Sequence, residues 1–406
     1  MGRLLAPLVE LVKNNAWLSY QAFLITSQVI ISFYTLLMNQ SGFEQNVISL
    51  SFAGYYLLSF FVLLLAGEQI KSPSKSTYYI SCLLVIASCI VALTEWVPEF
   101  VLMPLLLCML MVMKDGQNIH SLSEISKISN ATNFTKKELI SSSMFLSMML
   151  SVLLMPTLGK LFESNGQAQY LVVLVLVVIA MLMNRNAPSG NLEEASARDV
   201  SRLPLTLHKL CALSLLCNSV AFLTRFFVVP LIIFEVSDEY GYGEYAFSFL
   251  GVFLAFATLV SFALQKQQSD AKDARDMVVA YSIVVMACIG MAYSYDQILH
   301  GNSSIMIVIF ALGMYLLGEF FGKLWSINFM ASLYNAHESD SKGESCIKSY
   351  LHCFMLYKAI GGFVGFALCG LLTRWLSVFE MVFMAGFVSF CYGFKYLSKP
   401  SQAVTN

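Results

Sequence analysis

The chain has 406 residues, of which 58% are hydrophobic and only 12% are charged, and its formal net charge is −1. Soluble domains carry about a quarter of charged residues, so this composition excludes a protein with one water-soluble core and indicates that lipid is the solvent. The near balance of charge gives no support for nucleic-acid binding.

Continuously apolar runs alternate along the chain with short polar connections. A helix needs about 20 apolar residues to cross a bilayer, whereas membrane strands would alternate polar and apolar residues. The sequence therefore predicts an all-α polytopic membrane protein with 12 transmembrane helices. They cover residues 15–38, 47–66, 77–97, 99–121, 138–160, 167–184, 208–234, 244–264, 277–295, 303–328, 347–371 and 376–396.

The 24 Lys and Arg residues fall almost entirely in every second connection. Because basic connections stay on the cytoplasmic side, both termini are predicted to be cytoplasmic. Lys160 and Arg374 fall on the opposite side. Four other basic residues lie at apparent membrane depth, where a charge costs at least about 2.5–3.5 kcal/mol, and they indicate where function should be sought: Lys114, Arg225, Lys323 and Lys358.

One long charged connection, residues 185–206, divides the predicted helices into two sets of six. The sequence thus predicts an N-terminal six-helix bundle at residues 1–184, a cytoplasmic central linker at 185–206 and a C-terminal six-helix bundle at 207–406. Two such bundles are typical of secondary carriers.

Two connections carry similar short motifs. The loop after the second predicted helix reads GEQIKSPSKS and contains Gly67, Lys71 and Lys75. The corresponding loop after the eighth reads KQQSDAKDAR and contains Asp270 and Arg275. The fifth predicted helix reads SVLLMPTLGK near its end.

With twelve helices, cytoplasmic termini and a central linker, the whole chain resembles the major facilitator superfamily. That family carries Gly-x-x-x-Asp-Arg-x-Gly-Arg-Arg in the first loop, where this chain has Lys71 in place of the Asp. Its fifth helix carries Gly-x-x-x-Gly-Pro-x-x-Gly-Gly, of which Pro156 and Gly159 remain. The resemblance implies that these residues, with Gly67, Lys75, Asp270 and Arg275, belong to gating segments of a carrier that opens to one side at a time.

The tenth predicted helix has the most informative polar stripe. Tyr315, Glu319, Lys323 and Ser326 follow i, i+4, i+8 and i+11 spacing and so share one face. In the functional interpretation Glu319 is a protonatable coupling group, with Lys323 as its alternating ion partner or as an anion contact. The alternative is a static ion pair that fastens the bundle.

The fourth predicted helix carries a related acid–base pair, Lys114 and Asp115, beside Gln117 and Asn118. The resemblance supports a position facing the central cavity, because the family often has Arg-x-x-Gln-Gly there. The alternative is that this helix ends near Val112, which would leave the pair in cytoplasmic solvent.

Three further helices supply candidates. Arg225, with Asn218 two turns earlier on the same face, cannot lose its charge and needs an acidic partner or an anionic ligand. Lys358 shares a face with small residues, including Gly362, and is a second candidate for charge switching. The first predicted helix offers only an uncharged stripe, Gln21, Gln28 and Thr35, which suits either a cavity lining or hydrogen bonds between helices.

The candidate cavity carries more bases than acids, which favours an anionic or zwitterionic solute. The sequence predicts a proton-coupled secondary transporter of a small organic solute, a monomer that crosses a bacterial-type inner membrane many times. We expect no enzymatic activity, cofactor or metal. Two alternatives are an efflux carrier for drug-like or siderophore-like molecules and a receptor that keeps the carrier fold, which Lys71 in the first gating loop would suit.

Overall fold

The computed structural model describes residues 2–65, 75–94, 114, 118–119, 121–164, 167–185, 205–265, 274–340 and 347–397. These residues are almost entirely helical. The elements are α1 (Gly2–Lys13), α2 (Asn15–Gln40), α3 (Gln45–Leu65), α5 (Lys75–Leu93), α7 (Lys136–Ser164), α8 (Ala168–Arg185), α9 (Leu205–Leu223), the π-helix η2 (Thr224–Val228), α10 (Val229–Glu239), the 3-10 turn η3 (Gly243–Tyr245), α11 (Ala246–Gln265), α12 (Ala274–Leu299), α13 (Ile305–Asp340), α14 (Ile347–Leu372) and α15 (Val378–Leu397).

Each predicted transmembrane segment except 99–121 coincides with described helix, and the bounds agree to within about five residues except at the end of 303–328. Most of residues 99–121 lies outside the described part of the chain. Seven of the described helical segments are long and apolar enough to cross a membrane, and shorter apolar helices cover Cys82–Leu93, Tyr170–Leu182 and Val378–Gly393. The all-helical multi-pass character is confirmed, while the arrangement of twelve helices as six plus six stays a prediction.

Three features differ from the sequence prediction. An additional helix, α1, precedes the first apolar run and packs against α7. The seventh predicted helix is interrupted by the π-helix η2. The tenth continues as α13 to Asp340, well beyond the apolar run.

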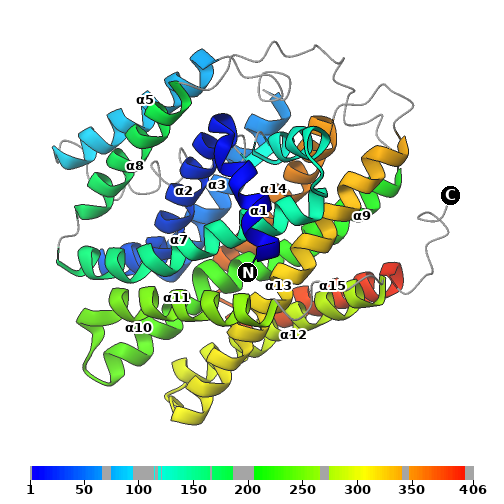
Figure 1. Ribbon diagram of the computed structural model, residues 1–406. Coiled ribbons are helices and arrows are strands. Elements are labelled where there is room, and N and C mark those ends of the chain that lie inside the picture. The colour runs from blue at the N-terminus through cyan, green and yellow to red at the C-terminus, as the bar shows by residue number, and fades with distance from the viewer. Residues whose placement is uncertain are drawn as a thin grey trace.

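The helices before residue 185 (the N-terminal half) meet those after residue 205 (the C-terminal half) along a defined seam. In this seam α3 packs along α14, α7 along α11, and α2 against η2 and α10. Helices α5 and α8 lie at one side of the molecule and α12 and α15 at the opposite side (Figure 1). This packing places α2 and α3 close to η2, the turn that contains Arg225.

Glycine allows the closest approach in this seam. A Cβ atom on Gly159 of α7 would lie 2.5 Å from the Phe247 carbonyl oxygen of α11, and one on Gly251 of α11 would meet the Met155 carbonyl oxygen of α7. The backbones of α7 and α11 are therefore in direct contact at Gly159 and Gly251. Pro156 lies in the same contact, 3.2 Å from the Cβ position of Gly251.

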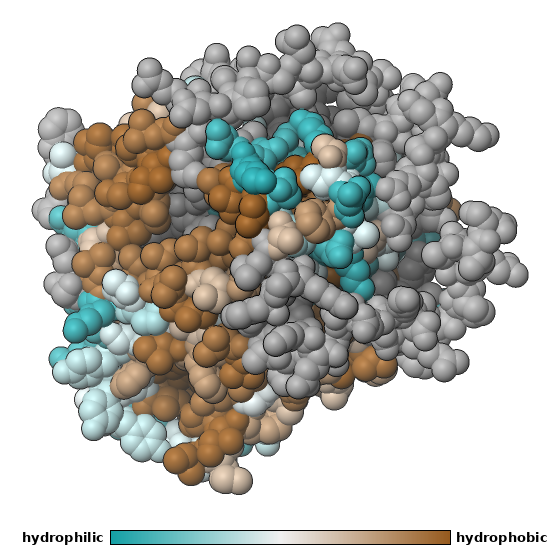
Figure 2. All heavy atoms as spheres, in the orientation of Figure 1, coloured by the Kyte–Doolittle hydropathy of each residue, from teal (hydrophilic) through white to brown (hydrophobic). Residues whose placement is uncertain are grey.

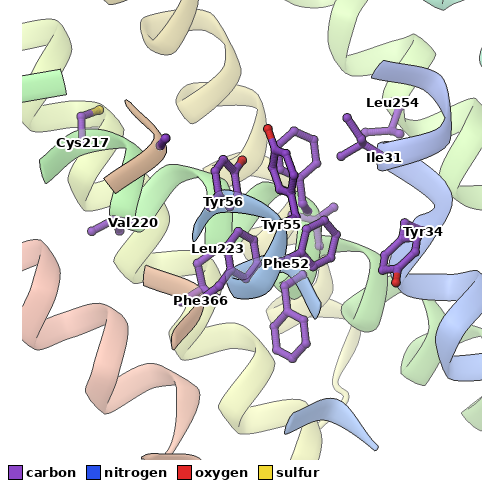
Figure 3. Close-up of a cluster of buried hydrophobic side chains, with 14 of the residues drawn as sticks. Ile31, Tyr34, Phe52, Tyr55, Tyr56, Cys217, Val220, Leu223, Leu254 and Phe366 are labelled. Carbon is purple, nitrogen blue, oxygen red and sulfur yellow. The ribbon is translucent and has the colours of Figure 1, made fainter. Parts of the chain in front are cut away.

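Aromatic side chains fill the centre of the seam. Phe52 of α3 stacks on Phe366 of α14 with ring centroids 4.7 Å apart, and Tyr56 of α3 stacks on Phe222 of α9 at 5.6 Å. Figure 3 shows Tyr34, Phe52, Tyr56 and Phe366 gathered in one cluster. Such offset stacks add about 0.5–1.5 kcal/mol per pair beyond the burial of area.

Large apolar side chains cover much of the outer surface. Figure 2 shows broad hydrophobic areas on the visible face. Leu65, Leu182, Met306 and Phe387, from four different helices, are each more than half exposed. Contiguous apolar surface of this extent suits contact with lipid rather than water.

Candidate functional site

The seventh predicted helix has a local cause for its interruption. In a regular α-helix the carbonyl group of Phe226 would accept a hydrogen bond from the N–H of residue 230, but that residue is Pro230, which has no N–H. The helix widens over Thr224–Val228, where the Val229 N–H reaches back to the carbonyl of Thr224. Arg225 lies in this π-helical turn, and such turns occur often at functional sites.

Glu319 is the centre of a buried charge cluster. Its Oε1 atom lies 3.1 Å from Nη1 of Arg225 and accepts a hydrogen bond from the Tyr315 hydroxyl at 3.2 Å. Its Oε2 atom lies 3.6 Å from Nζ of Lys323, an ion-pair distance that is too long for a hydrogen bond. Two cations and a phenol therefore surround one carboxylate.

The three charged side chains differ in exposure. The Arg225 side chain is 40% exposed, whereas those of Glu319 and Lys323 are 8% and 17% exposed. The Lys323 ammonium is itself buried and makes no hydrogen bond within the described part of the chain. The guanidinium is thus the most accessible of the three charged groups.

The cluster lines a cavity of about 160 Å³ in the C-terminal half. Its wall combines polar groups with aromatic and sulfur-containing side chains from α9, η2, α12 and α13. The polar side chains are Asn218, Arg225, Tyr315, Glu319, Lys323 and Ser326. The predicted stripe of Tyr315, Glu319, Lys323 and Ser326 is thus one face of α13, and Asn218 lines the same cavity as Arg225.

Lys358 lies beside the wall of the cavity. Its ammonium group is 5.6 Å from the ring centroid of Phe222, and Phe222 lines the cavity. The glycines near it on α14 pack tightly: a Cβ on Gly361 or Gly365 would meet a backbone carbonyl of α9, and one on Gly362 would lie 2.5 Å from the Tyr56 ring. Lys358 is therefore placed next to Phe222 and close to the seam.

Gln21 lies in a separate polar cluster in the N-terminal half. Its side-chain amide donates a hydrogen bond to the Ser147 hydroxyl at 2.6 Å and accepts one from the Ser121 hydroxyl at 3.3 Å. Both ends of the amide are therefore engaged with neighbouring segments. The structure does not bring Gln21 to the wall of the charged cavity.

Several other candidates are only partly described. Lys114 is helical and half-buried, and Asp115 lies outside the described residues. Gly67 and Asp270 also lie outside them, while Lys75 begins α5 and Arg275 lies in the first turn of α12. Of the gating candidates, only Pro156 and Gly159 are placed in a contact, the one between α7 and α11.

Two kinds of residue at this site were not singled out from the sequence. Phe222 and Trp325 line the cavity beside Arg225, as do Cys217 and Cys288. A chain with 31 Phe and 19 Tyr residues gives no local signal for one aromatic wall. Pro230, in contrast, was a usable signal, because a proline inside an apolar run predicts a distortion one turn before it.

Among the residues that the structure describes, no group of three or more His, Cys, Asp or Glu side chains could hold a metal ion.

The long apolar helices point to one class, the multi-pass membrane proteins. The particular structures to which this chain is similar are two crystal structures of the nucleoside transporter NupG. The first is 12% identical and covers 98% of this chain and 99% of NupG, with a TM-score of 0.59. The second, of a point mutant, is 14% identical and covers 96% and 99%, with a TM-score of 0.61. No family model matches the sequence, and no curated protein matches it.

Proposed function

We propose that this protein is a secondary transporter of a small organic solute that carries a planar ring and an anionic or zwitterionic group. The observation that carries the proposal is the partly exposed Arg225 at the wall of a cavity, beside the buried side chains of Glu319 and Lys323. A buried charge cluster is costly in a membrane and marks a functional path more often than a structural one. The likeness in fold to a nucleoside transporter supports the transport class.

The chemistry of the cavity supports the class of solute. Among the described residues of the wall, two bases and one acid leave an excess positive charge, and the guanidinium fork suits a carboxylate or phosphate group. Phe222 and Trp325 offer apolar ring surfaces beside it. A flat heterocycle with an acidic group would use both kinds of contact.

A thermal-shift screen of the purified protein tests this class. We expect orotate, a pyrimidine with a carboxylate, to raise the melting temperature more than uracil, which has the same ring without that group. Uridine and cytidine test the neutral nucleosides suggested by the structural neighbours. Stabilisation by the neutral compounds alone would contradict the anionic character proposed for the solute. Uptake of a stabilising compound into proteoliposomes tests transport separately.

We further propose that Glu319 couples transport to protons. Protonation would remove the acidic partner that Arg225 and Lys323 share in the cavity wall, and an anionic solute could then take its place. The other titratable groups at the described wall are Tyr315 on α13 and Cys217 and Cys288 on α9 and α12.

Replacing Glu319 with Gln is therefore expected to abolish accumulation driven by a pH gradient in proteoliposomes, while exchange of labelled for unlabelled solute continues. Glu10→Gln, which removes an exposed pair with Lys13, should leave both activities unchanged. If the Glu319 variant still accumulates solute at the native level under a pH gradient, the coupling role is wrong.

We propose that transport proceeds by alternating access. The two halves would rock about the seam so that the cavity opens to one side of the membrane at a time. The topology with cytoplasmic termini, the inner-membrane location and the monomeric state belong to this proposal. Transport assays in right-side-out and inverted vesicles separate uptake from export, because the two run oppositely under one imposed gradient.

A further inference from the structure

One hydrogen bond joins the π-helical turn to the opposite half of the molecule. The hydroxyl group of Thr35 in α2 donates to the backbone carbonyl of Phe226 in η2. Thr35 is fully buried, and Phe226 is nearly so. The bond thus crosses the seam, between a helix of the N-terminal half and the turn that holds Arg225.

This bond answers a local need that Pro230 creates. Because Pro230 lacks the N–H that would pair with the Phe226 carbonyl in a regular α-helix, a donor from outside the helix is valuable at this point. A buried carbonyl without a partner costs about 1–3 kcal/mol. Thr35 supplies the donor from the other half.

Arg225 precedes Phe226 directly, so the same turn fixes the direction of its side chain. The Arg225–Glu319 contact joins η2 to α13, whereas the Thr35–Phe226 bond joins η2 to α2. Thr35 is not among the residues that line the cavity. The most direct route from Thr35 to the ion pair is therefore the backbone of the turn.

We propose that Thr35 is a positioning residue that ties the Arg225–Glu319 ion pair to the relative placement of the two halves. While the bond is made, the turn keeps its π-helical form and Arg225 faces Glu319. When the halves move apart along α2 and η2, the bond breaks and the turn is free to change form, which turns the guanidinium away from Glu319. This inference rests on the proposed transport cycle.

A double-mutant cycle on the purified protein in detergent tests it without any ligand. Thr35→Val, Glu319→Gln and the double variant are compared by melting temperature. Distant sites without shared partners give additive effects. We expect instead that the loss caused by Glu319→Gln falls to less than about half its native size in the Thr35→Val background, because Arg225 has already left the carboxylate.

Two matched variants make the cycle specific. Thr35→Ser keeps a hydroxyl and should restore the full effect of Glu319→Gln. Ser389→Ala removes a buried hydroxyl that bonds Tyr281 between α15 and α12, and its effect should add to that of Glu319→Gln. Additive melting temperatures for Thr35→Val and Glu319→Gln would overturn the proposal.

Pro230→Ala provides an independent arm. The alanine introduced at this position would supply the missing N–H to the Phe226 carbonyl, so Thr35→Val should lower the melting temperature less in this background than in the native chain. An equal loss in both backgrounds would also contradict the proposal. Because none of these measurements involves transport, they can fail while the transport function stands, and the reverse is also true.

Discussion

Replacing Arg225 with Gln is expected to abolish stabilisation by anionic ligands and to lower the melting temperature of the ligand-free protein. Among the described residues, the substitution leaves the buried Glu319 carboxylate with Tyr315 at 3.2 Å and Lys323 at 3.6 Å. Removing one partner of a fully buried pair costs about 3–5 kcal/mol. Since the Arg225 side chain is 40% exposed, solvent screening reduces the expected loss to roughly 2 kcal/mol.

Arg225→Lys separates the structural role from the binding role. Lysine keeps the positive charge beside Glu319 but lacks the planar fork that holds a carboxylate through two hydrogen bonds. We expect a melting temperature close to that of the native protein, together with a clearly smaller thermal shift with orotate. If Arg225→Gln shows the same orotate shift as the native protein, Arg225 is a structural partner of Glu319 and does not contact the solute.

The sequence allowed the helices to be predicted because lipid imposes a simple rule on them. Continuously apolar runs of about 20 residues are stable in a bilayer as helices, and so most of the predicted segments match the described helices within a few residues. The stripe on α13 was also predictable, since i, i+4 spacing alone places Glu319 beside Lys323. This part of the site lies on one helix and needs no tertiary information.

The partner of Arg225 could not be derived in the same way. Arg225 and Glu319 lie on different elements, and spacing along the chain does not report on contacts between helices. The sequence required an acid or an anion for Arg225 but could not choose between them. The structure resolves this: η2 packs against α12, and the Arg225 guanidinium reaches the α13 carboxylate that also faces Lys323.

The seam shows a similar limit. Gly159 was identified through a degraded motif, whereas its counterpart Gly251 belongs to no motif in the sequence. Their shared role appears only when α7 and α11 lie together. The π-helical turn could be predicted in part. Pro230 predicts a distortion, but the hydroxyl group that donates to the Phe226 carbonyl belongs to Thr35, which is 191 residues away along the chain.

Replacing Gly251 with Ala is expected to disrupt the seam, lowering both the melting temperature and transport. The new methyl group would meet the Met155 carbonyl oxygen and approach the Pro156 Cα atom at 3.2 Å, and neither is the end of a flexible side chain. Helix α11 would have to move away from α7, at a cost of about 1–3 kcal/mol for overpacking. Because these helices belong to opposite halves, the strain falls on the contact between the halves.

Gly54→Ala is the matched control, because Gly54 also lies inside a helix but has no atom within 4 Å of its Cβ position. In a helix interior Ala is more stable than Gly by about 0.5–1 kcal/mol, so this variant should be neutral or slightly more stable. The two variants are thus predicted to change stability in opposite directions.

Maleimide labelling of a Ser248→Cys variant, quantified by mass spectrometry, reports on the same contact, because the Ser248 Cα atom lies 3.2 Å from the Cβ position of Gly159. Labelling should rise when Gly251→Ala is added. Unchanged labelling with native stability would mean that the close approach of α7 and α11 is not required.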